Sequence, residues 1–161
     1  MKLKQKLTAG ITLINKKYKR KEFYHYFKEP DNVVLIPIIK GKFLIVEQKR
    51  EPINKKNYEF PMGWIDKGET SVNASKRELL EETGYKSLIK PKKLIECFPD
   101  PGRGSRSCIF YYSNKIKKIQ KPEKNIKIFF ASKKKIKKLI KLKKFNNASH
   151  IAGFYSYINK I

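Results

Sequence analysis

The segment that decides the fold runs from residue 63 to residue 85 and reads GWIDKGETSVNASKRELLEETGY. Apolar residues recur at helical spacing in its second half, and residues that begin and end helices flank that half. Thr70 or Ser71 can cap the start with a side-chain oxygen, and Gly84 suits the left-handed backbone just past the end. The segment therefore predicts a loop followed by a helix over residues 72–83.

Three glutamates share one face of this predicted helix. At about 100° per residue, Glu82 lies roughly 40° and Glu81 roughly 60° from Glu78 around the helix axis. Like charges this close repel each other, and the helix dipole is also unfavourable there, so a positive partner is expected. Carboxylate oxygens on one rigid face suit Mg²⁺ or Mn²⁺. The alternative is a solvated acidic surface without a ligand.

The rest of the chain is strongly basic. The sequence has 161 residues, with 39 Lys+Arg against 14 Asp+Glu and a formal net charge of +25. Only five of the 39 basic residues are arginines, and isoleucine and asparagine are abundant, a bias typical of AT-rich genomes. Arginine forks, on which base recognition depends, are scarce. A nucleic-acid partner is therefore not expected. The acidic segment differs in charge from the rest of the chain and is the better indication of function.

Length and composition also limit the class of protein. A chain of 161 residues, 40% hydrophobic and 12% aromatic, predicts one folded domain over residues 1–161. No apolar run approaches the roughly 18 residues of a membrane span, and residues 1–6 lead into no apolar stretch of a secretory signal. Cys97 and Cys108 form no disulfide framework, so we expect a cytoplasmic protein.

Periodicity predicts a mixed sheet with helices packed on it. The helices are expected over residues 72–83 and 133–145 and after Asn147, which can cap the last one. Polar residues 52–57 predict a loop. Strands are expected at residues 11–14, 23–27, 33–39, 43–48, 58–60, 94–98, 108–113 and 126–130.

The spacing within residues 63–85 matches a known pattern. Gly63, Glu69, Arg77-Glu78, Glu81-Glu82 and Gly84 stand at the defined positions of the Nudix box, and the one soft point is Tyr85, where an aliphatic residue is commoner. The chain therefore resembles the Nudix hydrolase family. The resemblance implies an α/β fold, an α/β/α sandwich with a mixed β-sheet between helices. It also implies metal-dependent hydrolysis of a nucleoside diphosphate linked to some other group.

The resemblance also implies roles for single residues. Glu78 and Glu82 match the principal Mg²⁺ or Mn²⁺ ligands, Glu81 contributes, and the backbone carbonyl of Met62 is a further ligand. Glu69 and Arg77 match a pair that braces the loop onto the helix. Gly63 and Gly84 supply backbone freedom in support of the site.

Flanking residues are similar to the ADP-ribose and ADP-sugar pyrophosphatases within that family. Upstream they are Gln48-Lys49-Arg50 and Glu59-Phe60-Pro61-Met62-Gly63, and downstream Pro101 lies sixteen residues past the box. The resemblance implies ADP-ribose or another ADP-sugar as the substrate, split into AMP and a sugar phosphate. The substrate-binding candidates are Arg50, Glu59, Pro101, Arg103 and Arg106, and the candidate general base is Glu123, the only acid between Asp100 and Ile161.

Other interpretations stay open. The N-terminal strands of that subfamily form dimers, so residues 1–30 are expected to form a homodimer interface, and Tyr24, Tyr26 and Phe27 are either core residues or stack on adenine. A Nudix enzyme for nucleoside triphosphates, dinucleoside polyphosphates or RNA 5′ ends is one alternative. A non-catalytic Nudix-fold binding module is another, although such modules usually lack a box glutamate. His25 and His150 are interpreted as structural.

Overall fold

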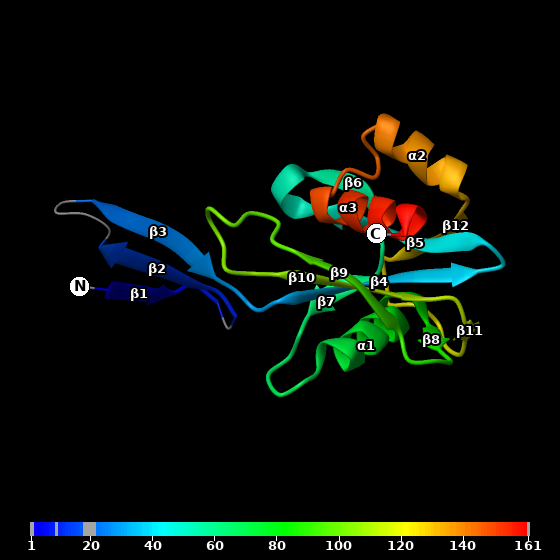
Figure 1. Cartoon of the computed structure of the whole chain (residues 1–161), viewed down its shortest axis with the longest axis horizontal. Helices are drawn as coiled ribbons and strands as arrows, with labels where there is room; N and C mark the ends of the chain where they lie inside the picture. The colour runs from blue at the N-terminus through cyan, green and yellow to red at the C-terminus, as the bar shows by residue number, and fades with distance from the viewer. Residues whose placement is uncertain (1, 9, 18–21, 161) are drawn as a thin grey trace.

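The protein is described here by a computed structural model, which covers residues 2–8, 10–17 and 22–160. Figure 1 shows an α/β body from which a small three-stranded sheet extends. The strands are β1 (Lys2–Lys6), β2 (Thr12–Lys17), β3 (Phe23–Lys28), β4 (Asn32–Ile39), β5 (Lys42–Arg50), β6 (Lys55–Glu59), β7 (Met62–Trp64), β8 (Tyr85–Ser87), β9 (Lys92–Cys97), β10 (Cys108–Ser113), β11 (Ile116–Lys118) and β12 (Lys127–Ala131). The helices are α1 (Ser71–Thr83), α2 (Lys133–Lys141) and α3 (Ala148–Asn159), and a short 3₁₀ helix spans Glu51–Ile53.

The body is built on a mixed sheet with the strand order β12-β5-β4-β10-β9. β10 runs parallel to β4, and the other neighbouring strands are antiparallel. β4 and β5 pair only beside their hairpin, through Ile38 with Phe43 and Ile39 with Lys42. Beyond that point β7 pairs with β4 and β6 pairs with β5. The connection from β6 to β7 therefore lies between the two central strands.

Alternate residues of β4 enter two different cores. Val33 packs in a cluster with Leu79 of α1, whereas Val34 packs in a cluster with Ile136 of α2 and Phe154 of α3. Because successive side chains of a strand point to opposite faces of the sheet, α1 covers one face and α2 and α3 cover the other (Figure 1). The predicted α/β fold with a mixed sheet between helices is confirmed.

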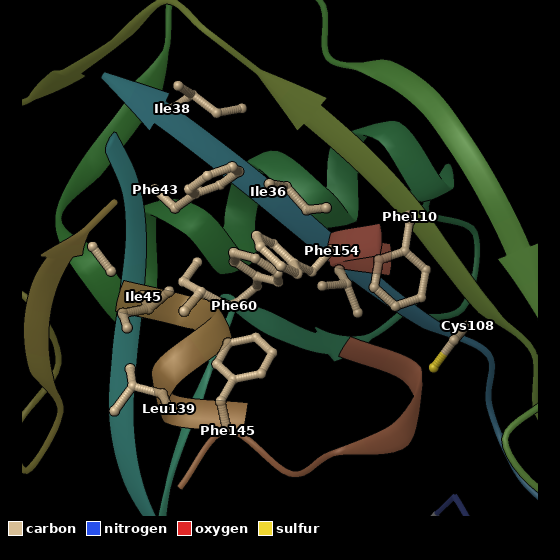
Figure 2. Packing of buried hydrophobic residues seen from close by; sticks show 13 residues of the cluster. Ile36, Ile38, Phe43, Ile45, Phe60, Cys108, Phe110, Leu139, Phe145 and Phe154 are labelled. Carbon is tan, nitrogen blue, oxygen red and sulfur yellow. The ribbon is translucent and has the colours of Figure 1, made fainter. Parts of the chain in front are cut away.

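Aromatic rings dominate the core under α3 (Figure 2). Phe60, on the connection between β6 and β7, is fully buried and meets Phe145 edge to face, with ring centroids 5.3 Å apart. Gly153 lets α3 approach closely, because a Cβ there would overlap the ring of Phe110. Each fully buried phenylalanine contributes about 1.5–3 kcal/mol to folding. This packing fixes the position of the β6–β7 connection.

The N-terminal sheet contacts the body through backbone hydrogen bonds of β3. The N–H of Phe27 donates to the carbonyl of Arg103 at 2.7 Å, and the carbonyl of Phe27 accepts from Ser105 at 2.9 Å. β1 was not among the strands expected from the sequence, and residues 18–21, between β2 and β3, lie outside the described residues. Phe23, Tyr24 and Phe27 of β3 are exposed on this sheet.

Two expectations about secondary structure were wrong, and one small sheet was not expected. Residues 52–57 are not all loop, because β6 begins at Lys55 and pairs with β5. The helix expected to reach residue 145 ends at Lys141, and Phe145 turns into the aromatic core. β8 and β11 form a small separate sheet that the sequence did not predict. Within the described ranges, no helix is both long and apolar enough to cross a membrane.

His150 is fully buried at the start of α3. Its ring stacks on Phe60, and its Nδ1 accepts a hydrogen bond from the backbone N–H of Phe60 at 3.0 Å. This bond needs a lone pair on Nδ1, and burial lowers the pKa of His150 to about 4. His150 is thus a neutral core histidine that ties α3 to the β6–β7 connection.

We predict an acid-sensitive contribution to stability from His150. Its pKa is lowered on folding, so the unfolded chain binds more protons between about pH 4 and pH 6.5, and stability falls as the pH falls through that window. The loss should be on the order of 2 kcal/mol by pH 5. Urea unfolding of the wild type and of His150→Asn between pH 7 and pH 5 measures it. Between pH 7 and pH 5 the free energy of unfolding of the wild type should fall by about this amount relative to His150→Asn, and this difference cancels the opposite contribution of Glu82, whose pKa is raised on folding. His25→Asn should keep the pH dependence of the wild type, and equal pH dependence in the wild type and in His150→Asn contradicts the assignment.

Candidate active site

Helix α1 presents the acidic face, and its ends are fixed as the sequence predicts. Thr70 is the N-cap: its side-chain oxygen accepts from the N–H of Asn73 at 3.4 Å. Gly84 ends the helix at φ 73°, donating to the carbonyl of Leu80 at 2.8 Å. Ala74 and Leu79 are buried against the sheet. With both ends and one face fixed, the remaining face holds its carboxylates in defined positions.

Glu82 is the most enclosed of the three box glutamates, with 7% of its surface exposed. Gln48 Nε2 donates to its Oε1 at 2.6 Å, and the backbone N–H of Met62 donates to its Oε2 at 3.1 Å. Burial raises the pKa of Glu82 to about 8, and the nearby charge of Glu78 adds to the increase. No ion pair to Glu82 is formed within the described part of the chain. Its ionised form is therefore costly without a cation.

The carbonyl of Met62 points to the same side as Glu82. In the β4–β7 ladder, Leu35 N–H donates to Pro61 and Ile65 N–H donates to Asp31, so the hydrogen-bonded positions of β7 are the odd-numbered ones. Met62 lies opposite Val34 at a non-bonded position, where both its N–H and its carbonyl point away from β4. Since the N–H reaches Glu82, the carbonyl faces α1 as well.

Glu78 lies against the backbone of Gly63. A Cβ built at Gly63 would overlap the carboxylate of Glu78, so only glycine leaves room for it. The side chain of Glu78 is 13% exposed, and burial raises its pKa despite its ion pair with Arg77 at 2.6 Å. Glu81 is more open, at 52% exposed, and pairs with the same guanidinium at 3.2 Å.

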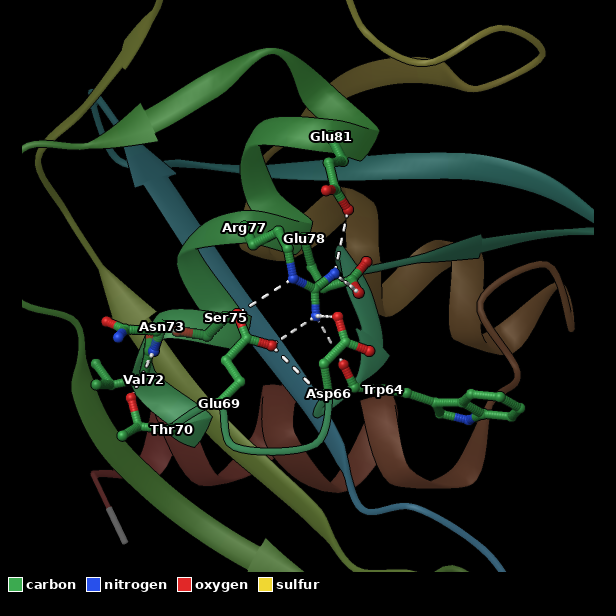
Figure 3. A network of polar contacts seen from close by, with 10 residues as sticks. All are labelled: Trp64, Asp66, Glu69, Thr70, Val72, Asn73, Ser75, Arg77, Glu78 and Glu81. Carbon is green, nitrogen blue, oxygen red and sulfur yellow. Dashed lines mark hydrogen bonds and ion pairs between the residues drawn. The ribbon is translucent and has the colours of Figure 1, made fainter. Parts of the chain in front are cut away.

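Arg77 connects α1 to the loop that precedes it, residues 64–69 (Figure 3). Its guanidinium donates to both oxygens of Glu69, at 3.2 and 2.8 Å, and to the carbonyl of Trp64 at 2.9 Å. The forked geometry with Glu69 is the strong, bidentate kind. The same group contacts Glu78 and Glu81, so one arginine both anchors residues 64–69 and offsets part of the charge of α1.

The donor set fits a hard divalent cation, although the carboxylates are not gathered around one point. No group of three or more His, Cys, Asp or Glu side chains within residues 2–8, 10–17 and 22–160 is close enough to hold a metal. Arg77 draws Glu78 and Glu81 to itself, and Glu82 turns to Gln48. Buried Glu82 and half-buried Glu78, both with raised pKa values, are nevertheless the groups that a cation would stabilise. Glu78 and Glu82, with Glu81 and the Met62 carbonyl, are the residues that fit it.

Arg50 and Glu59 are paired beside this site. Arg50 Nε donates to Glu59 Oε1 at 3.1 Å, its Nη2 bonds Oε2, and Asn57 donates to Oε1 at 2.8 Å. Glu59 is only 1% exposed, so both oxygens are enclosed, and its candidate role shifts from touching substrate to holding Arg50. Arg50 remains 36% exposed and lies close enough to Glu82 for the two charges to interact.

The other candidates lie in two places. Pro101 and Arg103 are exposed in the loop that meets β3, and Arg106 pairs with Glu29 at 3.3 Å. They line the junction with the N-terminal sheet, and no contact with the carboxylates of α1 is found within the described ranges. Glu123 does reach α1: its N–H donates to the backbone carbonyl of Glu81 at 3.0 Å, while its side chain stays exposed.

The chain is similar to known proteins in sequence and in fold. A family model described as NUDIX domain matches residues 28–149. The chain belongs to the Nudix family. It is 46% identical over 78 residues to a putative nudix hydrolase 2 from Caenorhabditis elegans, a match that covers 45% of this chain and 34% of that protein. It is 33% identical over 93 residues to an ADP-ribose pyrophosphatase from Bacillus subtilis (strain 168), covering 57% of this chain and 48% of that one.

These matches span about a third to a half of the length of the two curated relatives. Among solved structures, one titled crystal structure of ADP compounds hydrolase aligns with a TM-score of 0.82 and 15% identity. That alignment covers 99% of this Nudix chain and 90% of the other, and at such low identity it shows the fold alone.

One contact was missed by sequence reasoning. Gln48 was noted only as part of a similarity, yet its amide touches Glu82. The signal was present in the spacing: Gln48 and Arg50 are two residues apart on a strand and therefore share a face. What the sequence lacked was the partner of that face, because the pairing of β5 with β6 and β12 is set by residues far away in the chain.

We predict that Gly63→Ala weakens divalent-cation binding without unfolding the protein. The added methyl group displaces the carboxylate of Glu78, which is the flexible end of its side chain, so the strain can be relieved by moving the candidate ligand. Mn²⁺ affinity measured by calorimetry should fall roughly tenfold or more. Gly102→Ala is the matched control, since its Cβ meets only Asp100 at an ordinary 3.8 Å. Equal Mn²⁺ affinity in the two variants contradicts the prediction.

Proposed function

We propose that this Nudix protein hydrolyses the diphosphate bond of a nucleoside diphosphate linked to another group, with Mg²⁺ as its cation and an ADP-sugar such as ADP-ribose as its substrate. The observation that carries the proposal is the pair of enclosed carboxylates on α1, one buried and one half-buried. Glu78 is held against Gly63, and Glu82 is held between Gln48 and Met62. Two enclosed negative charges are stable when a divalent cation binds between them and the substrate, because the positive charge of the cation offsets both the carboxylates and the diphosphate.

In the proposed reaction a water oxygen attacks one phosphorus, the bridging P–O bond breaks, and the two phosphates separate. The bound cation supplies charge neutralisation of the diphosphate and activation of the water. The chain's own residues hold the parts in place: Arg77 and Glu69 fix the loop of the site, and Arg50 offers its remaining N–H donors to a phosphate oxygen. Glu123 is the proposed general base that accepts the proton of the water.

The substrate assignment rests on likeness and on charge. The relative from Bacillus subtilis is named as an ADP-ribose pyrophosphatase, and the structurally similar protein is titled an ADP compounds hydrolase. Arg50 beside Glu82 suits a substrate whose phosphates bridge the cation and an arginine fork. Arg103, exposed beside Pro101 at the junction with the N-terminal sheet, and Arg106 are the proposed contacts of the sugar or its phosphate.

A substrate panel tests the assignment. With Mg²⁺ present, ADP-ribose, ADP-glucose, NADH, diadenosine polyphosphates, 8-oxo-dGTP and triphosphorylated RNA are compared by kcat/KM. ADP-ribose or ADP-glucose should give the highest value, with AMP as a product. A preference for the RNA or for a nucleoside triphosphate overturns the substrate class, and no hydrolysis of any compound leaves the binding-module alternative.

We predict that Glu82→Gln abolishes turnover while the fold persists. The amide keeps the shape of the side chain but loses the charge that would hold the cation. The loss of kcat should be at least about 10³-fold, measured at saturating Mg²⁺ together with the thermal midpoint. Glu96→Gln, which changes an acid on β9 paired with Lys93, is the matched control. Near wild-type turnover in Glu82→Gln would contradict the assignment of Glu82 as a metal ligand.

We predict that Glu123→Ala slows hydrolysis by about 10²-fold or more, because it removes the proposed proton acceptor. KM should change little, since the backbone of Glu123 and not its side chain bonds α1. Lys124→Ala in the same loop controls for local disturbance. A loss smaller than about tenfold in kcat assigns the general base elsewhere.

The proposed functional unit is a homodimer formed through β1, β2 and β3. The exposed aromatic side chains of β3, which include Phe23 and Phe27, give this sheet apolar surface beyond what a solvated hairpin needs. Sedimentation of the wild type and of Phe23→Ser measures the association, and a monomeric wild type at micromolar concentration rejects it.

A further inference from the structure

The carboxylate of Glu82 is held from two directions by neutral donors. Gln48 supplies a side-chain N–H at 2.6 Å and Met62 a backbone N–H at 3.1 Å, one to each oxygen. A carboxylate oxygen has two lone-pair directions, so each oxygen keeps one for a further partner. The two donors thus fix the plane of the carboxylate without using up its capacity to accept.

Gln48 is held in place by the strand that carries it. In the β-ladder Gln48 is opposite Asn57 of β6, and its neighbour Glu47 is opposite Lys127 of β12, so β5 is paired on both sides here. Its side chain is half-buried and points to the same face as Arg50. The pairing fixes the backbone from which the Gln48 side chain extends, and the hydrogen bond of its amide to Oε1 fixes the amide against Glu82.

The neutrality of Gln48 matters for the same reason. A lysine or arginine at this position would also donate to Glu82, but its charge would compete with a cation for the carboxylate. An amide orients the carboxylate and leaves its full negative charge available. The hydrogen bond from Gln48 thus orients Glu82 for metal binding, whereas an ion pair would neutralise the charge of Glu82 before a cation could bind.

We propose that Gln48 is a positioning residue that orients the Glu82 carboxylate for the divalent cation and so sets metal affinity. The proposal rests on the proposed function, since it takes Glu82 as a metal ligand. Gln48 acts through Glu82 and needs no contact with the substrate.

The choice of variant follows from the surroundings of Gln48. Its half-buried side chain reaches from β5 to the carboxylate of Glu82 on α1. Gln48→Ala would leave space beside Glu82 for a water that can donate in place of the amide. Gln48→Met fills nearly the same volume and has no N–H, so it removes the hydrogen bond alone.

The matched control is the same replacement one residue along. Lys49 points to the other side of β5, is 53% exposed and pairs with Glu51 at the surface. Lys49→Met therefore changes β5 by a methionine without touching Glu82. Mn²⁺ binding to the wild type and to both variants is measured by calorimetry without substrate. Gln48→Met should bind Mn²⁺ about 10- to 100-fold more weakly, and Lys49→Met should stay within about threefold of the wild type.

Kinetics separate positioning from general damage. In Gln48→Met the activity should recover as Mg²⁺ is raised, while KM for the nucleotide at saturating Mg²⁺ stays within about threefold, because Arg50 keeps its partners. If Gln48→Met does not fold, judged by its thermal midpoint in EDTA, Gln48→Asn replaces it. Asparagine is one methylene shorter, so its amide falls short of Glu82, and the same loss of Mn²⁺ affinity is expected.

The outcomes distinguish the positioning role of Gln48 from the proposed function. If the wild type binds Mn²⁺ and Gln48→Met binds it equally well, the positioning role is overturned and the proposed function stands. If the wild type binds no Mn²⁺, metal-dependent hydrolysis is rejected and the role of Gln48 with it. If Gln48→Met loses affinity but Lys49→Met loses as much, the effect belongs to β5 in general and the assignment to Gln48 fails.

Discussion

The burial of the Glu82 carboxylate is the constraint around which this molecule is arranged. An ionised group at 7% exposure must be compensated, and here neutral donors from β5 and β7 do part of that work. Both strands reach Glu82 only because β4 and β5 diverge after two residue pairs and leave room for the β6–β7 connection. Phe60 and His150 hold that connection from the other face of the sheet. The core under α3 therefore supports a site on the opposite face.

The parts of the fold that follow from neighbouring residues could be predicted from the sequence. Thr70 and Gly84 mark the ends of α1 because capping depends on a few adjacent groups. Apolar runs locate β4 and β5, and the brace between Glu69 and Arg77 lies where the family resemblance implies it. Within the site, the resemblance also gives the set of glutamates. These features are encoded within about twenty residues of chain.

What could not be predicted depends on partners distant in sequence. Glu59 reads equally well as a surface acid or a buried one until the register of β5 and β6 places it beside Arg50. Lys55 and Lys56 look like loop residues because the sequence does not show that β5 offers them an edge to pair with. The helix beginning at Lys133 is shorter than its apolar periodicity implies, because Phe145 is drawn into the aromatic core. In each case long-range packing decides between local alternatives of similar energy.

The contact between α1 and the loop carrying Glu123 is made mainly by main-chain atoms, with one longer bond from the Gln120 side-chain amide to the Leu80 carbonyl at 3.5 Å. Ile119 and Gln120 donate N–H bonds to the Gly84 carbonyl, Glu123 donates to Glu81, and the Gln120 carbonyl occupies the space that a Cβ of residue 84 would need. Hydrogen bonds between main-chain atoms depend little on which side chains the loop carries. Apart from Glu123, side chains of this loop can therefore drift toward lysine without loosening its attachment to α1, while a single methyl group at position 84 would dislodge it.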